Sequence, residues 1–311
     1  MKTIVQYSYD PPLESFIPDV YFRKKVRTAD PFINIESRRT ARIFARQIYI
    51  DRYGDDIHIR SLTGIESLLN LNTFKCSNSN IKTLKLPNSP KLYAYLNDNI
   101  FLEQVDLKSL DSLKGIHISN SSLLNILDCS DLISLTSLSL SHNNIHILDL
   151  SNNKQLESLS VQEANLRMID VTKNTKLVSL RFGGLIDFFN NVLFKSDIDK
   201  INISENKLLK SIFFNHTKIR SLDMSNNLEI ELIECNHNLL DTINISKNIT
   251  LKSLNCSNNN IKFLDVSNSP NLLHLDCTNN PIEIVFVNEK FDLNNPLPTY
   301  KIPPTAKFRK K

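Results

Sequence analysis

The five cysteines are the first residues to test for chemistry, because a thiolate can act as a nucleophile or bind a soft metal. Four of them stand two residues after an apolar residue of a recurring phrase, at Cys76, Cys235, Cys256 and Cys277. Other copies of the phrase carry Leu140, Val161 or Phe214 at this position. We therefore interpret the cysteines as small apolar core residues and expect no nucleophile among them. Buried free thiols suit a reducing compartment, so we expect a cytoplasmic or host-cell intracellular protein.

The histidines and aspartates show no strong metal-binding pattern. His216 and His237 hold the same position in successive copies and should stack, which we interpret as two solvated turn histidines, with a weak metal site as the alternative. Single aspartates recur once per copy, at Asp106, Asp128, Asp149, Asp170, Asp223 and Asp265. One carboxylate per copy supplies too few oxygens for a calcium ion, which takes about six to eight. We expect these aspartates to cap the turns that follow them, and we expect no catalytic residue, metal or cofactor.

A repeated phrase sets the elements that position these residues. It is clearest as LNCSNNNIKFLDVSNSPNL at residues 254–272, and weaker copies run back to about residue 71. The leading apolar residues recur every 21 or 22 residues, except for one step of 32 between Leu177 and Leu209. A unit this short cannot bury its own apolar face, so the units must stack.

Each copy reads approximately L-x-x-L-x-L/C-x-x-N-x-I-x-x-L-D-V-S, as in the copy that runs from Leu135 to Leu150. This pattern resembles the leucine-rich repeat family, whose core is L-x-x-L-x-L-x-x-N-x-L, and is most similar to bacterial or large-DNA-virus members. The resemblance covers about residues 57–288. It implies an α/β-type solenoid that is mostly β: a horseshoe or arc with a parallel sheet on the concave face and short strands or turns on the convex side.

The residues themselves favour the same arrangement. Leu254 and Cys256 alternate with polar residues, so they should point into the core of a strand layer. Where the chain leaves the strand, a buried asparagine can satisfy loop backbone groups, and four copies have one, at Asn143, Asn238, Asn259 and Asn280. Other copies depart from asparagine, at Ser79, Ile100, Ser121, Ala164 and Thr217. We therefore expect the N-terminal half to be less regular.

This pattern divides the chain into three parts. Residues 1–56 should form an N-terminal segment and helical cap, with an amphipathic helix over 35–53 that could instead dock on a membrane surface or a partner. Residues 57–288 should form a solenoid of about ten repeats. Residues 289–311 contain four prolines, and the last eleven residues carry five basic side chains. We expect an extended strap with a loose basic end, or a nuclear-targeting signal at its last residues.

The 32-residue step contains an apolar insertion at residues 183–197. We interpret it as a short helix packed on the flank of the solenoid. The alternative is a partner-binding protrusion that presents Phe188 and Phe189, because insertions in such repeats map to loops that often lie on the binding face.

Composition excludes several functional classes. The net charge is +4, but the repeat body is mildly acidic between basic ends, which disfavours a nucleic-acid binder. Only five glycines are present, which argues against an enzyme built on phosphate-binding loops. No apolar run reaches the roughly 18 residues of a membrane span, and the first residues make a poor secretory signal.

The outward strand positions change character along the repeats. They are mainly serine in the middle of the chain and become Arg181, Phe213, Leu232 and Glu234 near the insertion. Exposed apolar residues beside charged ones are typical of binding hot spots. We expect a non-enzymatic, monomeric protein–protein interaction scaffold that binds an unknown protein partner on its concave face. The alternative is a regulator or effector that docks on and modulates a cellular or host enzyme.

Overall fold

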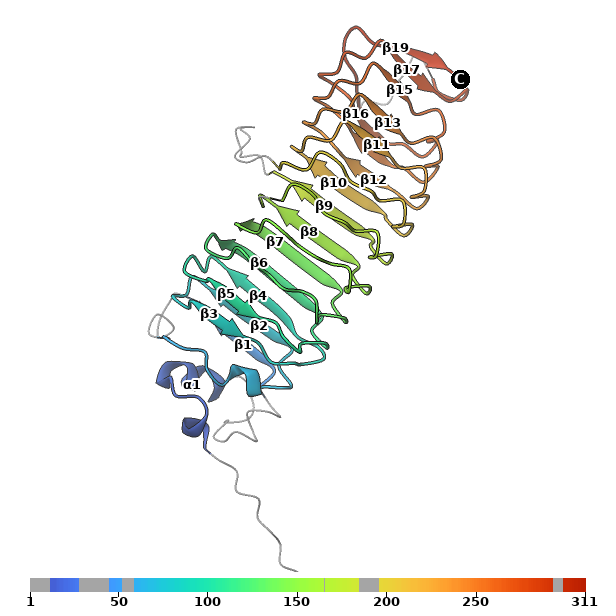
Figure 1. The fold of residues 1–311 in the computed structure, drawn as a ribbon. Helices are drawn as coiled ribbons and strands as arrows, with labels where there is room; N and C mark the ends of the chain where they lie inside the picture. Colours follow the sequence, from blue (N-terminus) through green and yellow to red (C-terminus); the bar gives the residue numbers. More distant parts are fainter. Residues whose placement is uncertain (1–11, 28–44, 52–58, 165, 185–195, 293–298) are drawn as a thin grey trace, which may run out of the picture. The chain divides into compact units, whose positions relative to one another are not determined.

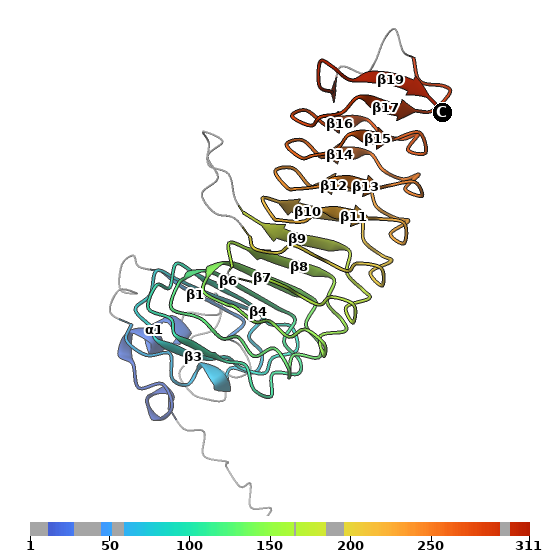
Figure 2. The ribbon, with the colours of Figure 1, turned by 45° about the horizontal axis from the view of Figure 1, so that its top comes forward.

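The computed structural model describes residues 12–27, 45–51, 59–164, 166–184, 196–292 and 299–311. The chain divides into two compact units, residues 1–124 and 125–311. In each unit short strands stack coil on coil, as Figures 1 and 2 show, and the strands pair in parallel. The predicted fold, a mostly β solenoid with a parallel sheet, is confirmed.

The N-terminal unit joins a short cap to the first coils. The cap contains the 3-10 helix η1 (Leu13–Ser15) and helix α1 (Val20–Arg27), which buries Phe22 and Val26. Asp19 begins α1 by accepting the backbone N–H groups of Tyr21 and Phe22 at 3.0 and 2.9 Å.

The coils of this unit build two sheets. The longer one has the order β1 (Gln47–Ile50), β2 (Thr73–Ser77), β4 (Tyr93–Asn97) and β6 (Gly115–Ser121). The shorter one pairs β3 (Thr83–Lys85) with β5 (Gln104–Asp106), and the 3-10 helix η3 (Ile65–Ser67) precedes β2.

The C-terminal unit repeats the same coil. Its long sheet has the order β7 (Ser137–Asn143), β8 (Ser158–Gln162), β9 (Ser179–Gly183), β10 (Ser211–Asn215), β12 (Leu232–Glu234), β14 (Ser253–Asn255), β16 (His274–Asp276) and β18 (Tyr300–Lys301). The other side of the coils carries two small sheets, β11 (Ser221–Asp223) with β13 (Thr242–Asn244), and β15 (Phe263–Asp265), β17 (Ile284–Val287) and β19 (Lys307–Lys310). We call the outward side of each long sheet its sheet face.

The core follows the predicted alternation. In β8 the buried Leu159 and Val161 alternate with half-exposed neighbours, and Leu159 pairs in register with Leu180 of β9. All five cysteines are free and buried within these apolar columns. Burial raises the pKa of the Cys129 and Cys277 thiols to about 12, so both stay protonated and unreactive near neutral pH.

The predicted asparagines form a ladder that links successive coils. The Asn259 side-chain N–H₂ donates to Cys235 O and Cys256 O, both at 3.0 Å, and its oxygen accepts the N–H of Leu240 at 2.9 Å. Asn238 and Asn280 bond in the same manner. Each amide therefore satisfies loop backbone groups that would otherwise be buried without partners.

The expected departure at Ile100 was wrong. Asn99 holds the ladder position, because it follows the inward Leu96 by three residues, as Asn143 follows Leu140. It is buried, and its N–H₂ donates to Cys76 O at 2.8 Å. Ser79 is a departure in sequence, yet its N–H and hydroxyl both donate to the Asn99 oxygen. The loss of asparagine at Ser79 therefore does not loosen this coil.

A second asparagine ladder runs on the other side of the coils, and the sequence patterns did not indicate it. Its members are fully buried: Asn153, Asn174, Asn206, Asn227 and Asn248. Each donates its N–H₂ to two backbone carbonyls of the preceding coil; Asn174, for example, reaches Leu150 O and Asn153 O, both at 3.0 Å. The aspartates behave as predicted, since Asp170 accepts the N–H and hydroxyl of Thr172 at 2.9 and 2.7 Å.

Two expectations for the ends require correction. Residues 47–50 belong to β1 and not to the expected helix 35–53, because Ile48 and Ile50 alternate inward against β2; the part of that helix before residue 45 lies outside the described residues. The last basic residues are not loose, because β19 pairs with β17 and Lys311 N–H donates to Val287 O at 2.9 Å. Among the described residues, no helix is long and apolar enough to cross a membrane.

Candidate interaction surface

Three of the predicted binding residues form one row on the sheet face of the C-terminal unit. Arg181 of β9 pairs in register with Phe213 of β10, which in turn pairs with Glu234 of β12. All three are half-exposed. The sheet thus places a cation, an aromatic ring and a carboxylate side by side at the spacing of parallel strands, about 4.8 Å. We call these residues the Arg181 row.

The Arg181 guanidinium lies over the Phe213 ring. Its central carbon is 3.8 Å from the ring centroid, which is close enough for a cation–π interaction of about 0.5–2 kcal/mol. Burial lowers the pKa of Arg181, while Glu234 opposes that shift. The stacked ring therefore holds the guanidinium in place with its N–H groups available to a ligand.

Glu234 is held in a less polar setting than an ordinary surface carboxylate. Burial raises its pKa, the hydrogen bond from Asn255 and the charge of Arg181 lower it, and Asp276 raises it. Leu232 lies in the neighbouring row, in register with Ser211 and Ser253, and is half-exposed. The apolar Leu232 and the partly desolvated Glu234 lie on one strand, two residues apart.

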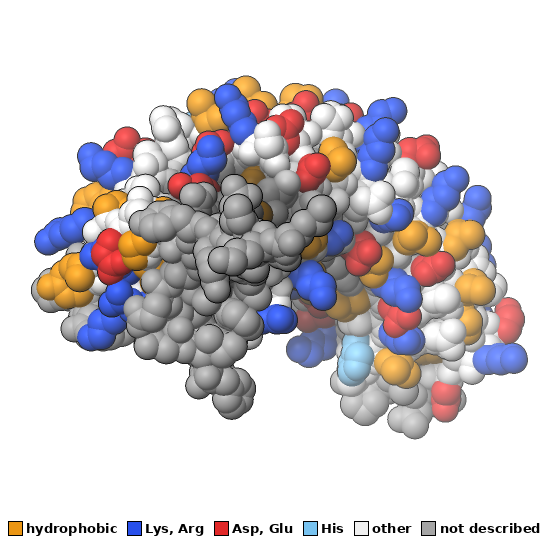
Figure 3. Space-filling view, turned by 90° about the horizontal axis from the view of Figure 1, so that it is seen from below, with side chains coloured by type: hydrophobic (Ala, Val, Ile, Leu, Met, Phe, Trp, Pro, Cys, Tyr) orange, Lys and Arg blue, Asp and Glu red, His pale blue; other side chains and the backbone are white. Residues whose placement is uncertain are grey.

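The rest of this sheet face is chemically uniform before β9. The outward residues of β7 and β8 are mainly serines, as expected: Ser137, Ser139, Ser141, Ser158 and Ser160. By contrast, the face of the molecule shown in Figure 3 has basic and acidic side chains interspersed over its surface. The change of side-chain type at Arg181 is therefore a local feature of this sheet.

The insertion leaves and rejoins the sheet beside this row. Gly183 has φ 120°, and a Cβ there would lie 1.7 Å from Asn215 O, so only glycine fits where the chain departs. Gly184 N–H donates to Asn215 O at 3.1 Å, and Ser196 N–H donates to His216 O at 3.0 Å. Both ends of the insertion are thus tied to the end of β10, two or three residues after Phe213. Phe188 and Phe189 lie outside the described residues.

The predicted histidine stack is present, but the expectation that both rings are solvated was wrong for His216, which is buried, whereas His237 is exposed. The rings of His216 and His237 lie 4.4 Å apart at an interplanar angle of 18°, and burial lowers the pKa of His237. His142 contacts Glu163 at the equivalent position of two earlier coils. Among the described residues, no group of three or more His, Cys, Asp or Glu side chains is placed to hold a metal ion.

The sheet face of the N-terminal unit carries an aromatic row that sequence reasoning missed. Tyr49, Lys75, Tyr95 and His117 are in register on β1, β2, β4 and β6. The Lys75 ammonium lies 5.4 Å from the Tyr49 ring centroid and 5.3 Å from that of Tyr95. Tyr95 and His117 stack at 4.7 Å and 8°. The alternating Y-A-Y-L at residues 93–96 was the available signal, since it places two tyrosines outward on one strand.

Comparison with known proteins identifies the fold. No family model and no curated protein matches the chain. An internalin, InlF, of Listeria monocytogenes has a similar structure, with a TM-score of 0.55 and 18% identity over 91% of this chain and 93% of that one. The functional domain of InlJ from the same organism gives a TM-score of 0.52 and 18% identity over 93% of this chain and 79% of that one.

A plant peptide hormone receptor, RGFR1, in complex with RGF2, gives a TM-score of 0.51 and 15% identity over 79% of this chain and 49% of that one. Together with the 21-residue period of the coils, these likenesses show that the chain has the leucine-rich repeat fold.

Proposed function

We propose that this chain is a non-enzymatic interaction scaffold that binds a protein partner through the Arg181 row and the adjacent Leu232. The observation that carries the proposal is the stack of Arg181 on Phe213 beside a partly desolvated Glu234. Arginine and aromatic residues dominate binding energy in protein interfaces, and a pre-ordered guanidinium loses little conformational entropy on binding.

The non-enzymatic role is supported by the state of the thiols. Burial raises the pKa of each cysteine for which a shift is resolved: Cys129, Cys235, Cys256 and Cys277. A protonated thiol sealed in an apolar column can neither attack a substrate nor ligate a metal. The exposed functional groups of the sheet face are instead charged and hydrogen-bonding groups, which suit a binding surface.

The insertion supports the choice of this end of the sheet. Its ends, Gly184 and Ser196, are hydrogen-bonded to Asn215, the last residue of the strand that carries Phe213, and to His216, the residue that follows it. The insertion thus begins and ends beside the Arg181 row, which supports a role for the inserted residues in binding. We propose that Phe188 and Phe189 extend the contact.

The test is a double variant with a matched control. Arg181→Ala with Phe213→Ala should weaken the binding of a partner recovered by affinity capture by roughly thirtyfold or more, since hot-spot truncations cost about 2 kcal/mol or more. Ser137→Ala with Ser158→Ala on the same sheet face should leave the affinity unchanged. Thermal unfolding of both variants establishes that they fold. Equal capture by wild type and the Arg181 and Phe213 variant would overturn the proposal.

A photo-crosslinking residue distinguishes the faces. A photo-crosslinker at Leu232 should label the partner. A photo-crosslinker at Leu228, an exposed leucine in the turn after β11, should not. Label from Leu228 alone would place the interface on the other side. If the partner is an enzyme whose rate changes on binding, the scaffold acts as a regulator.

A further inference from the structure

Strand β3 of the N-terminal unit has one open edge. Among the described residues it pairs in parallel with β5 alone, with Thr83, Leu84 and Lys85 opposite residues 104–106. Lys82 O accepts the N–H of Gln104 at 3.2 Å, so residues 82 and 84 direct their backbone groups toward β5. Alternate residues of a parallel strand face opposite neighbours. The N–H and C=O groups of Thr83 and Lys85 therefore point away from β5.

The segment that faces this edge is bonded elsewhere. The backbone N–H groups of Arg60 and Ser61 donate to the second carboxylate oxygen of Asp19, at 2.7 and 3.1 Å, and Thr63 N–H donates to the Ser61 hydroxyl at 3.1 Å. Within the described part of the chain, no backbone hydrogen bond joins residues 60–63 to β3. Asp19 thus holds residues 60–63 as a separate wall, and no described residue pairs with the outer edge of β3.

A groove lies between the wall and the strand. It encloses a cavity of about 520 Å³, within the range of about 300–1,000 Å³ that is usual for ligand pockets. Its apolar floor includes Leu62, Ile81 and Leu84, which are buried. The groove is therefore a preformed slot that runs along unsatisfied strand hydrogen-bonding groups.

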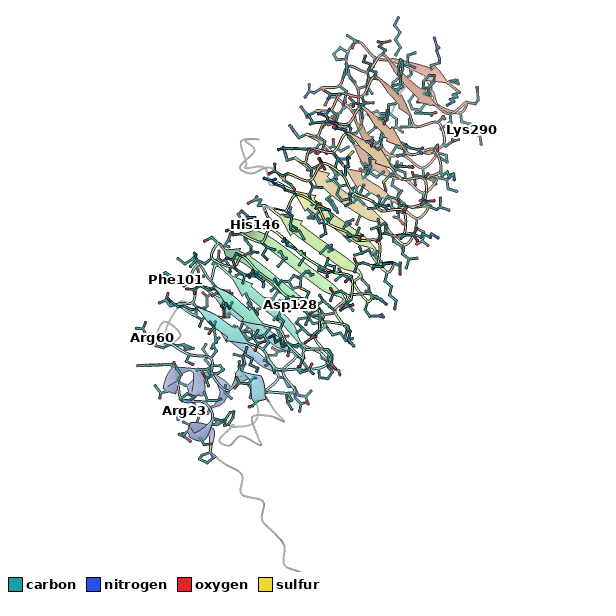
Figure 4. All side chains as sticks on the ribbon, viewed as in Figure 1. Arg23, Arg60, Phe101, Asp128, His146 and Lys290 are labelled. Atoms are coloured by element: carbon teal, nitrogen blue, oxygen red, sulfur yellow. The ribbon has the colours of Figure 1, made fainter. Side chains whose placement is uncertain are left out.

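The charges that line the groove favour a ligand with an acidic side chain. Lys82 and Lys85 make exposed ion pairs with Glu103 and Asp106 on the β5 side, at 3.5 and 3.6 Å. Arg60 lines the opposite wall, is exposed, and makes no ion pair with any described residue (Figure 4). The Glu66 carboxylate is occupied by the N–H of Gly64 at 2.9 Å. Arg60 is thus available to a carboxylate.

We propose that this groove binds an extended peptide that adds to the open edge of β3 as a third strand and places an acidic side chain against Arg60. Two residues of β3, Thr83 and Lys85, offer donor and acceptor pairs at the two-residue spacing of a strand, which is the pattern that an added strand satisfies. A small anion would use Arg60 but leave these backbone groups unpaired. The site is separate from the Arg181 row and does not depend on it.

The test begins with a displayed library of random ten-residue peptides selected on the full chain, with counter-selection on the Thr83→Pro variant. Proline at position 83 removes an outward N–H but leaves the β3–β5 bonds intact, because those use residues 82 and 84. Selected peptides should bind wild type and Thr83→Ala equally, and should bind Thr83→Pro about tenfold more weakly, the effect of losing one hydrogen bond of about 1.4 kcal/mol. Thermal unfolding confirms that each variant folds.

Two further measurements locate the peptide. Its binding should slow hydrogen exchange at the Thr83 and Lys85 amides while the already bonded Leu84 amide changes little, and Arg60→Gln should weaken binding of peptides that carry a carboxylate. The proposal is overturned if no peptide survives counter-selection, or if binding leaves exchange at Thr83 unchanged. It is also overturned if Arg60→Gln has no effect, or if millimolar inorganic phosphate displaces the peptide fully, which would indicate an anion site.

Discussion

Thr217 donates both its backbone N–H and its hydroxyl to the side-chain oxygen of Asn238 in the next coil, at 2.7 and 2.6 Å. The same asparagine returns its N–H₂ to Phe214 O and Cys235 O. One buried amide thus makes four hydrogen bonds, three of them to the preceding coil and one, to Cys235 O, within its own coil. The threonine that replaces asparagine in the earlier coil is therefore a partner of the ladder.

Asn238→Ala should lower the free energy of unfolding by about 3 kcal/mol, since it leaves several buried groups without partners at about 1–3 kcal/mol each. Urea denaturation measures the change. Thr217→Ala is the matched control, and should cost less because only one of the four bonds involves its hydroxyl. Equal and small losses for the two variants would contradict the assigned role of the amide.

The second ladder offers a comparison within one turn. Asn227 is fully buried and donates to Ile203 O and Asn206 O at 3.0 and 2.9 Å, whereas the adjacent Asn226 is exposed. Asn227→Ala should destabilise the C-terminal unit by about 2–3 kcal/mol. Asn226→Ala should stay within about 0.5 kcal/mol of wild type. Chemical denaturation of the two variants measures this difference. Similar denaturation midpoints would mean that the second ladder does not stabilise the C-terminal unit.

The stability of the C-terminal unit should depend on pH through His237. Burial lowers the pKa of this imidazole below its usual value of 6.5, so the folded state favours the neutral ring. Its contribution is complete above the unfolded pKa and is lost as the pH falls below about 6.5, because the unfolded chain then binds the proton more readily. We expect a lower free energy of unfolding at pH 5.5 than at pH 7.5. His237→Asn, with the residue found at positions 258 and 279 of later coils, should flatten this dependence in denaturation curves; an unchanged slope would contradict it.

Gly115 makes room for Tyr93 on the sheet face of the N-terminal unit. A Cβ at position 115 would lie 2.3 Å from the ring carbon Cδ1 of Tyr93. Gly115→Ala should therefore displace the ring and destabilise the unit by about 1 kcal/mol. In the Tyr93→Ser background the same substitution should cost nothing, which a double-mutant cycle of unfolding free energies measures. An equal cost in both backgrounds would mean that the Tyr93 ring is not the reason why glycine is required at position 115.

The repeat period predicts most of the fold, because inward leucines and the asparagine after each strand are local features of one coil. The two predictions that were wrong, at Ile100 and at residues 47–50, also have physical reasons. The ladder position of the coil that contains β4 is ambiguous by one residue between Asn99 and Ile100 in the sequence, and only the count from the inward Leu96 identifies Asn99. Residues 47–50 read as helix because Ile43, Phe44 and Ile48 have the spacing of one helix face with arginine between them. The strand is instead stabilised by pairing with β2, which is not local in the sequence.

The site divides in the same way. The outward positions of Arg181, Phe213 and Glu234 follow from strand alternation, so their common row could be predicted. The open edge of β3 could not, because it depends on Asp19, 41 residues before Arg60, drawing the facing segment aside. Complementary volumes such as Tyr93 and Gly115 are likewise relations between coils.

The second asparagine ladder gives the C-terminal unit a direction. Asn174, Asn206 and Asn227 each donate only backward, to carbonyls of the preceding coil. Removing a coil from the C-terminal end would leave the side-chain N–H₂ of every remaining ladder asparagine bonded, whereas removing one from the N-terminal end would leave a buried N–H₂ without its acceptors. New coils can thus be added by duplication at the C-terminal end at little energetic cost. The number of coils can therefore change over evolution more freely at that end than at the N-terminal end.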